Sequence, residues 1–178
     1  TREKSFSLLS KIRSFLSLSP FIRSNSKLIQ EVALIIKKYE SGFDRILIVS
    51  LSLAPVLDFL PEAVRDKVAI LAIDSYSHWF SFKVKNETNI FKKFIWWIEM
   101  RKGEAYERKY YDLCSLALFV SKVDAKYAEG LGPTKAKKVG MRYGIDLEKI
   151  NQGMDQFKDV TKEKETLLFT GNLGYGPN

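Results

Sequence analysis

The sequence has few of the residues that build metal centres and covalent cross-links. Among its 178 residues there is one cysteine, Cys114, and one histidine, His78. A lone cysteine excludes a disulfide within the chain, and a single histidine argues against a site of clustered His and Cys metal ligands. We therefore expect no metal site built from clustered His and Cys side chains.

Long apolar runs and targeting patterns are also missing. No stretch reaches the ~18 to 20 apolar residues that a membrane-spanning helix needs. Residues 1–20 spread their charges through the segment instead of placing them before an apolar block, which makes a poor secretory signal. We expect a cytoplasmic protein, and peripheral attachment to the inner face of the membrane stays open.

Motifs of several enzyme classes and of nucleic-acid-binding proteins are absent. The sequence contains no G-x-S-x-G, P-loop or G-x-G-x-x-G pattern. It also lacks zinc-finger spacing, RNA-binding aromatic motifs and a basic region with heptads. The net charge of +8, from 29 basic and 21 acidic residues, indicates an anionic partner. Because nucleic acid would rest on this charge alone, we expect no nucleic acid and retain anionic lipid and a nucleotide-linked substrate.

Short apolar runs alternate with helical patterns along the chain. Hydrophobic residues make up 46% and charged residues 28%, as in globular proteins. The alternation predicts an α/β fold, a Rossmann-like parallel sheet with helices on both faces. Strands are predicted at residues 45–49, 67–73, 116–120 and 137–141, and helices at residues 6–18, 26–41, 54–60, 89–112 and 123–130.

The apolar residues of the two longest helices are expected to form one side each. In the helix over residues 26–41 this side comprises Leu28, Val32, Ile35, Ile36 and Tyr39. In the helix over residues 89–112 it comprises Phe91, Phe94, Ile95 and Ile98, with Gly103 as a bend or break.

Two basic segments could lie on a membrane. The helix over residues 6–18 is amphipathic, and packing on its own domain is the commoner explanation of such a stripe. Trp96 and Trp97 stand among lysines, which suits a helix at a lipid interface but also suits a protein core. Both interpretations of the tryptophans stay open.

Polar residues follow the most apolar strand, residues 67–73, at the point where it ends. Asp74, Ser75, Ser77 and His78 occupy this position. In open parallel sheets, ligands bind in the crevice beyond the carboxyl ends of the strands. The alternative is that Asp74 and Ser75 only cap the following helix.

The strand over residues 116–120 repeats this arrangement. Ser121 and Asp124 follow it, and Asp146 comes after the strand over residues 137–141. Ser121 and Asp146 could line the same crevice. Alternatively, Ser121 and Asp124 cap the helix that they precede, and Asp146 caps a turn.

Three blocks of sequence carry a resemblance to a known family. They are AIDSYS at 72–77, YERKYYDLCSLALFVSKVDAKY at 106–127 and LLFTGNLGYGPN at 167–178. Together they resemble the group-one glycosyltransferases, family four, and within them the cell-envelope and exopolysaccharide sugar transferases. The matching positions are Asp74, Ser77, Glu99, Tyr106, Glu107, Val120, Ser121, Asp124, Gly144, Asp146, Phe169, Gly171, Asn172, Tyr175, Pro177 and Asn178.

The resemblance implies a retaining glycosyl transfer from a nucleotide-sugar donor to a saccharide or lipid-linked acceptor. Asp74 would be the catalytic or acceptor-orienting carboxylate. Ser77, His78, Ser121 and Asp146 would bind the acceptor. The backbone at Gly171 and Asn172 would face the donor phosphates, with no metal and no cofactor other than the nucleotide-sugar co-substrate.

Such enzymes have two facing Rossmann-like domains, and the resemblance covers only part of them. Residues 1–154 would be the acceptor-side domain without its first strands, residues 155–165 a linker, and residues 166–178 the start of the nucleotide-sugar-binding domain. We expect this piece to be inactive alone. The rival interpretation is a non-catalytic Rossmann-like module that docks on an anionic membrane or a protein partner.

Overall fold

The computed structural model describes residues 25–141, 144, 147–148 and 150–151. The chain divides into two units, Thr1–Tyr143 and Gly144–Asn178, and the sheet belongs to the first. The helix predicted over residues 6–18 lies outside the described residues. So do the predicted linker at 155–165 and the expected start of a second domain at 166–178.

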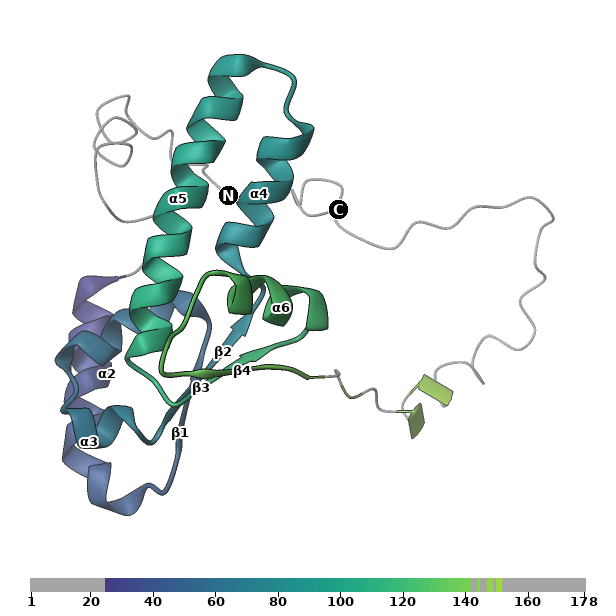
Figure 1. Cartoon of the computed structure of the whole chain (residues 1–178). Coiled ribbons are helices and arrows are strands. Elements are labelled where there is room, and N and C mark those ends of the chain that lie inside the picture. Colours follow the sequence, from purple (N-terminus) through teal and green to yellow (C-terminus); the bar gives the residue numbers. More distant parts are fainter. Residues whose placement is uncertain (1–24, 142–143, 145–146, 149, 152–178) are drawn as a thin grey trace, which may run out of the picture. The chain divides into compact units, whose positions relative to one another are not determined.

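Four parallel strands form the sheet of the first unit, in the order β1-β2-β3-β4 (Figure 1). The predicted α/β class with a parallel sheet is therefore confirmed. Each strand differs from its predicted range by one residue at one end. The strands are Ile46–Val49 (β1), Val68–Ile73 (β2), Leu116–Phe119 (β3) and Lys137–Gly140 (β4).

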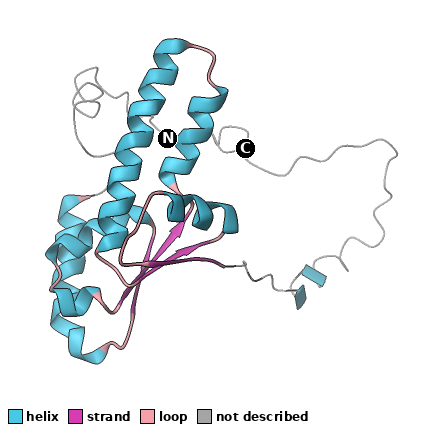
Figure 2. Ribbon diagram, viewed as in Figure 1, coloured by secondary structure: helices cyan, strands magenta, loops and turns pink. Residues whose placement is uncertain are grey.

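Helices connect the strands and also precede the first of them (Figure 2). The segment predicted as a helix over residues 54–60 is a longer 3₁₀ helix that contains Pro55. The helical elements are α2 (Ser26–Tyr39), η1 (Glu40–Gly42), η2 (Leu51–Phe59), α3 (Glu62–Arg65), α4 (Tyr76–Asn86), α5 (Ile90–Asp112) and α6 (Lys122–Gly130).

The two faces of the sheet are covered unequally within the described residues. Ile48, Ile70 and Ala117 lie in one row across β1, β2 and β3, with exposed fractions of 5%, 0% and 0%. On the opposite face of β1, Leu47 and Val49 are 55% and 48% exposed. The core therefore lies mainly on one face of the sheet.

Helix α2 buries a side that matches the predicted one only in part. Ile36 is buried and Val32 packs against the core, as predicted, whereas Leu28 and Ile35 are 44% and 57% exposed. The prediction was partly wrong because α2 carries apolar residues on more than one side, and sequence periodicity cannot then tell which side faces the core.

Helix α5 runs unbroken through Gly103, so a break of the helix there is wrong. A Cβ atom at this position would lie 3.4 Å from the Cα and Cβ atoms of Ser77 in α4. The absence of a side chain at Gly103 therefore lets α5 pack closely against the beginning of α4.

Candidate functional site

The backbone is strained where β1 and β2 end. Ser50, directly after β1, has a φ angle of 85°, and Ile73, the last residue of β2, has a φ angle of 65°. A β-branched residue such as isoleucine rarely adopts a positive φ. Such strain persists only where the surrounding structure enforces it, and it clusters at functional sites. The polar residues after β2 thus begin at a strained turn.

Asp74 follows this turn with an exposed side chain. Within the described part of the chain, its carboxylate has no hydrogen bond or ion pair. Partial burial, together with the nearby carboxylate of Asp124, raises the pKa of Asp74 above its ordinary value of 3.8. Asp74 is therefore not the helix cap, and its carboxylate can accept a hydrogen bond from a ligand.

Ser75 caps helix α4 instead. Its Oγ accepts a hydrogen bond from the backbone N–H of His78 at 3.2 Å. The same hydroxyl donates to the carboxylate of Glu107 in α5, at 3.1 Å to Oε1. Of the two residues that could cap α4, Ser75 is thus the one that does so.

A buried carboxylate holds the beginning of α4 in place. Glu107 is 0% exposed and accepts hydrogen bonds from the hydroxyl and the backbone N–H of Ser77, the latter at 3.3 Å. The first N–H groups of a helix have no partner within it, so Glu107 and the Ser75 hydroxyl together satisfy two of them. Burial raises the pKa of Glu107 despite these hydrogen bonds, which lower it.

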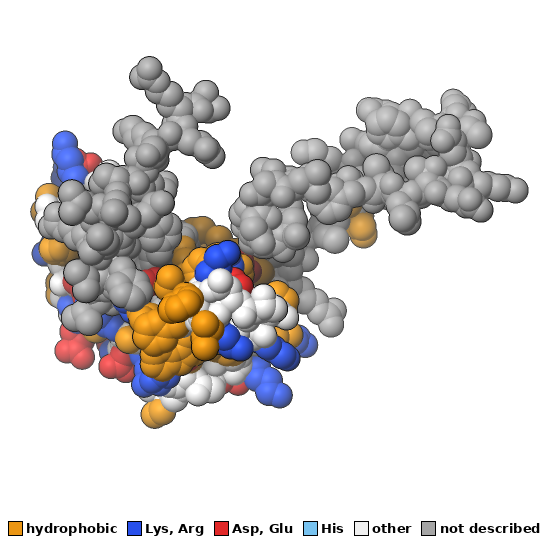
Figure 3. Space-filling model, turned by 90° about the horizontal axis from the view of Figure 1, so that it is seen from above, with side chains coloured by type: hydrophobic (Ala, Val, Ile, Leu, Met, Phe, Trp, Pro, Cys, Tyr) orange, Lys and Arg blue, Asp and Glu red, His pale blue; other side chains and the backbone are white. Residues whose placement is uncertain are grey.

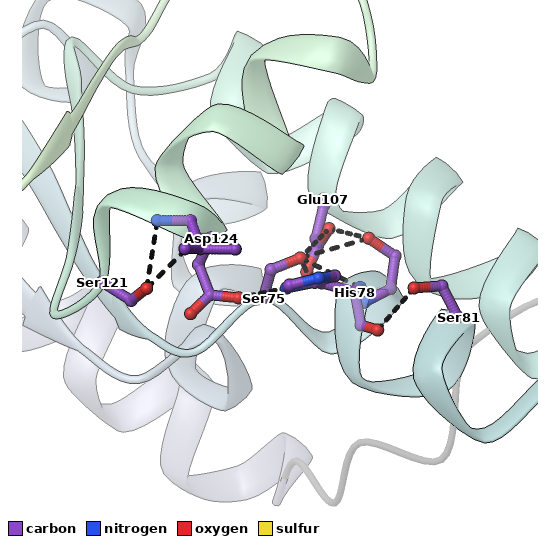
Figure 4. Close-up of polar contacts among 8 residues, drawn as sticks. Ser75, His78, Ser81, Glu107, Ser121 and Asp124 are labelled. Atoms are coloured by element: carbon purple, nitrogen blue, oxygen red, sulfur yellow. Dashed lines mark hydrogen bonds and ion pairs between the residues drawn. The ribbon is translucent and has the colours of Figure 1, made fainter. Parts of the chain in front are cut away.

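His78 is oriented by Asp124 of helix α6 (Figure 4). Its Nδ1 atom lies 2.6 Å from Oδ1 of Asp124, and its ring stacks on Tyr127 with centroids 4.5 Å apart. The His78 side chain is 33% exposed, whereas that of Asp124 is 15% exposed. Because Asp124 engages Nδ1, the other ring nitrogen, Nε2, is left to bind or to exchange a proton.

Ser121 caps helix α6, as the alternative interpretation had it. Its Oγ accepts hydrogen bonds from the backbone N–H groups of Val123 at 3.1 Å and Asp124 at 3.4 Å. Helices α4 and α6 therefore both begin at the edge of the sheet where β2 and β3 end. The positive ends of two helix dipoles favour electron-rich groups at this edge.

We expect neutral His78 to carry its proton on Nδ1, since that atom would then donate to Asp124. His78 is the only histidine, so in a tag-free chain the long-range ¹⁵N–¹H spectrum at about pH 8 contains a single imidazole. Asp124→Ala should remove this preference. Ser81→Ala is the matched control, because Ser81 bonds the backbone carbonyl of His78 and not its ring. A wild-type ring protonated on Nε2 would contradict this geometry.

Four of the predicted site residues lie at one edge of the sheet. Asp74 and Ser121 follow neighbouring parallel strands, as expected, and His78 stands one helical turn from Asp74. Ser77 is 0% exposed and bonded to Glu107, so in this structure it supports α4 and does not face an acceptor. The remaining predicted residues, Asp146, Gly171 and Asn172, lie outside the described residues.

The sequence patterns gave no site role to Glu107 or Tyr127, and Asp124 was predicted only as a capping residue. Glu107 is 30 positions from Ser77, and Asp124 is 46 positions from His78. No local spacing rule connects residues so far apart. The one available signal was that Glu107 and Asp124 match the glycosyltransferase pattern.

The described residues contain no group of three or more His, Cys, Asp or Glu side chains that could hold a metal ion. The candidate site combines the Asp74 carboxylate with the oriented imidazole of His78, at the carboxyl edge of the parallel sheet. The chain matches no protein-family model, no curated protein and no solved structure.

Proposed function

We propose that this chain is the acceptor-side domain of a retaining glycosyltransferase, which transfers a sugar from a nucleotide-sugar to a saccharide or lipid-linked acceptor. The reaction type is inferred from the resemblance to the group-one glycosyltransferases. One structural observation carries the proposal: the exposed Asp74 carboxylate has no partner among the described residues and follows a strained turn at the edge of the sheet.

Asp74 has the chemistry that an acceptor hydroxyl needs. A carboxylate can accept a hydrogen bond from that hydroxyl and take its proton as the oxygen attacks the donor sugar. A general base works best when its pKa lies near the operating pH, and the pKa of Asp74 is shifted upward in that direction. Nε2 of His78 would bind a second acceptor group.

The other predicted contacts complete the proposal. Ser121 and Asp146 would line the acceptor crevice. The Ser121 hydroxyl oxygen accepts the capping hydrogen bonds of α6, so its O–H would donate to the acceptor. The backbone at Gly171 and Asn172 would face the donor diphosphate. The leaving group would be neutralised by helix N-termini and fixed cations, without a metal ion.

The test uses the full gene product that contains this chain. It is incubated with a panel of nucleotide-sugars and with saccharide and lipid-linked acceptors, and release of nucleoside diphosphate is measured. We expect acceptor-dependent release from the full gene product and none from the 178-residue chain alone. In the isolated chain, acceptor saccharides should still shift the NMR signals of the His78 ring.

Two outcomes would contradict the proposal. Turnover by the isolated chain would show that these 178 residues contain the whole donor site, and not only its first contacts. No release by the full gene product, with no shift at His78, would favour the non-catalytic binding module.

A further inference from the structure

Helices α4 and α5 form a hairpin whose free end points away from the sheet (Figure 1). Large apolar side chains at this end are exposed to solvent, including Phe91 and Phe94, which sequence periodicity placed on the apolar side of the helix. We call the following residues the hairpin tip: Phe82 (65% exposed), Ile90 (74%), Phe91 (79%), Phe94 (57%) and Trp97 (47%).

The inner side of the hairpin is already occupied by its own aromatic contacts. Phe80 stacks on Trp96 with ring centroids 6.0 Å apart. The ammonium group of Lys83 lies over the rings of Trp79 and Trp96, at 4.2 Å and 4.6 Å. These contacts join the two helices. Of the tip residues, Phe94 and Trp97 stack on each other with ring centroids 6.0 Å apart, and both rings remain about half exposed. The tip side chains are thus available for a partner outside the described chain.

The positive charge around the hairpin tip favours an anionic partner. Residues 82–97 contain four lysines and one glutamate, a net charge of +3. Viewed end-on, the molecule presents a hydrophobic patch with blue Lys and Arg side chains beside it (Figure 3). Surfaces that contact a membrane interface combine aromatic rings, which enter the head-group layer, with lysines, which interact with anionic lipids.

We propose that the hairpin tip inserts into the head-group layer of an anionic lipid bilayer. A protruding end of two helices suits a bilayer surface, whereas a peptide would need a groove. A symmetric second copy fits poorly, because it would place Lys92 and Lys93 close to the same lysines of its partner. No helix among the described residues could span a bilayer, so the contact is one of surface insertion. This inference rests on the exposed surface and not on the proposed transferase activity.

Vesicle flotation of the tag-free 178-residue chain tests the proposal. We expect binding to vesicles that contain phosphatidylglycerol at low salt, weaker binding at high salt, and at least about tenfold weaker binding to pure phosphatidylcholine. Ile90→Ser/Phe91→Ser should reduce binding by about tenfold or more, because it removes the most exposed apolar groups. Lys92→Glu/Lys93→Glu should do the same, since each lysine contributes about fivefold.

The matched control is Leu34→Ser/Ile35→Ser in α2. These residues are 65% and 57% exposed, so the same kind of apolar surface is lost away from the hairpin. The control should bind as wild type does, with all variants checked for folding by circular dichroism.

Three results would overturn the proposal. The first is wild-type protein that is not retained on anionic vesicles at low salt. The second is a control that loses as much binding as the tip variants. The third is a chain whose self-association, measured by sedimentation velocity, is abolished by the tip variants while vesicle binding persists; that result would assign the surface to a second copy.

Discussion

Asp74→Asn is expected to lower the turnover of the full gene product by about 100-fold or more and to leave folding unchanged. Asparagine keeps the size of the side chain and one acceptor oxygen, but it cannot take a proton from an acceptor hydroxyl. Ser75, not Asp74, caps α4, so the substitution removes no helix cap. The measurement is the rate of nucleoside diphosphate release at saturating donor and acceptor.

The upward pKa shift of Asp74 predicts whether Asp74→Asn stabilises or destabilises the fold. A carboxyl group whose pKa is raised on folding stabilises the fold fully only below its unfolded pKa, and this contribution is lost as the pH rises through the folded value. At neutral pH, Asp74→Asn should therefore melt at the wild-type temperature or slightly above it. Asp44→Asn, the same exchange before β1, is the control that should retain full turnover. Near-normal turnover by Asp74→Asn would reject the catalytic role.

Glu107→Leu should destabilise the fold by about 3 kcal/mol. Leucine fits an apolar helix contact but accepts no hydrogen bond, so the hydroxyls of Ser75 and Ser77 and the N–H of Ser77 lose the carboxylate as their acceptor. The two hydroxyls lie 3.3 Å apart and can bond each other, so two of the three buried donors are left without an acceptor. Glu107→Gln keeps one acceptor oxygen and should cost about 1 kcal/mol. Urea unfolding at neutral pH measures both. In a Ser77→Ala background the cost of Glu107→Leu should shrink, because one donor is already gone.

The pH dependence of the Glu107 variants gives a second, independent measurement. Burial raises the pKa of Glu107, so its contribution to stability is complete below its unfolded pKa, ordinarily 4.5, and declines as the pH rises through the folded value. Relative to Glu107→Gln, the wild type should therefore lose stability with rising pH. A wild type that gains stability over Glu107→Gln in the same range would show that the hydrogen bonds to the carboxylate outweigh its burial.

Strands β1, β2 and β3 could be predicted closely because each is a short apolar run between polar residues. Strand β4 has the sequence KKVG and is not an apolar run. All four were placed to within one residue at one end, and their parallel pairing follows from the intervening helices. Helix α5 was placed equally well, since Asn89 caps its beginning with hydrogen bonds to the N–H groups of Phe91 and Lys92.

The packing of the helices could not be predicted in the same way. Periodicity shows that apolar residues share a side, but not whether anything covers that side. Phe91 and Phe94 share a side of α5 and are 79% and 57% exposed, because the hairpin extends past the core. The buried stripe of α5 instead includes Gly103 and the carboxylate of Glu107.

The sequence by itself determined the α/β class, the four strands and the edge of the sheet at which Asp74, His78 and Ser121 gather. These depend on local patterns and on the geometry of parallel strands. Only the tertiary structure decided which polar groups near this edge already have a hydrogen-bond partner. The Ser77 hydroxyl bonds Glu107, and Nδ1 of His78 bonds Asp124. The physical reason is that a hydrogen bond depends on distance in space. α5 and α6 bring these carboxylates to α4 from positions that sequence spacing does not connect.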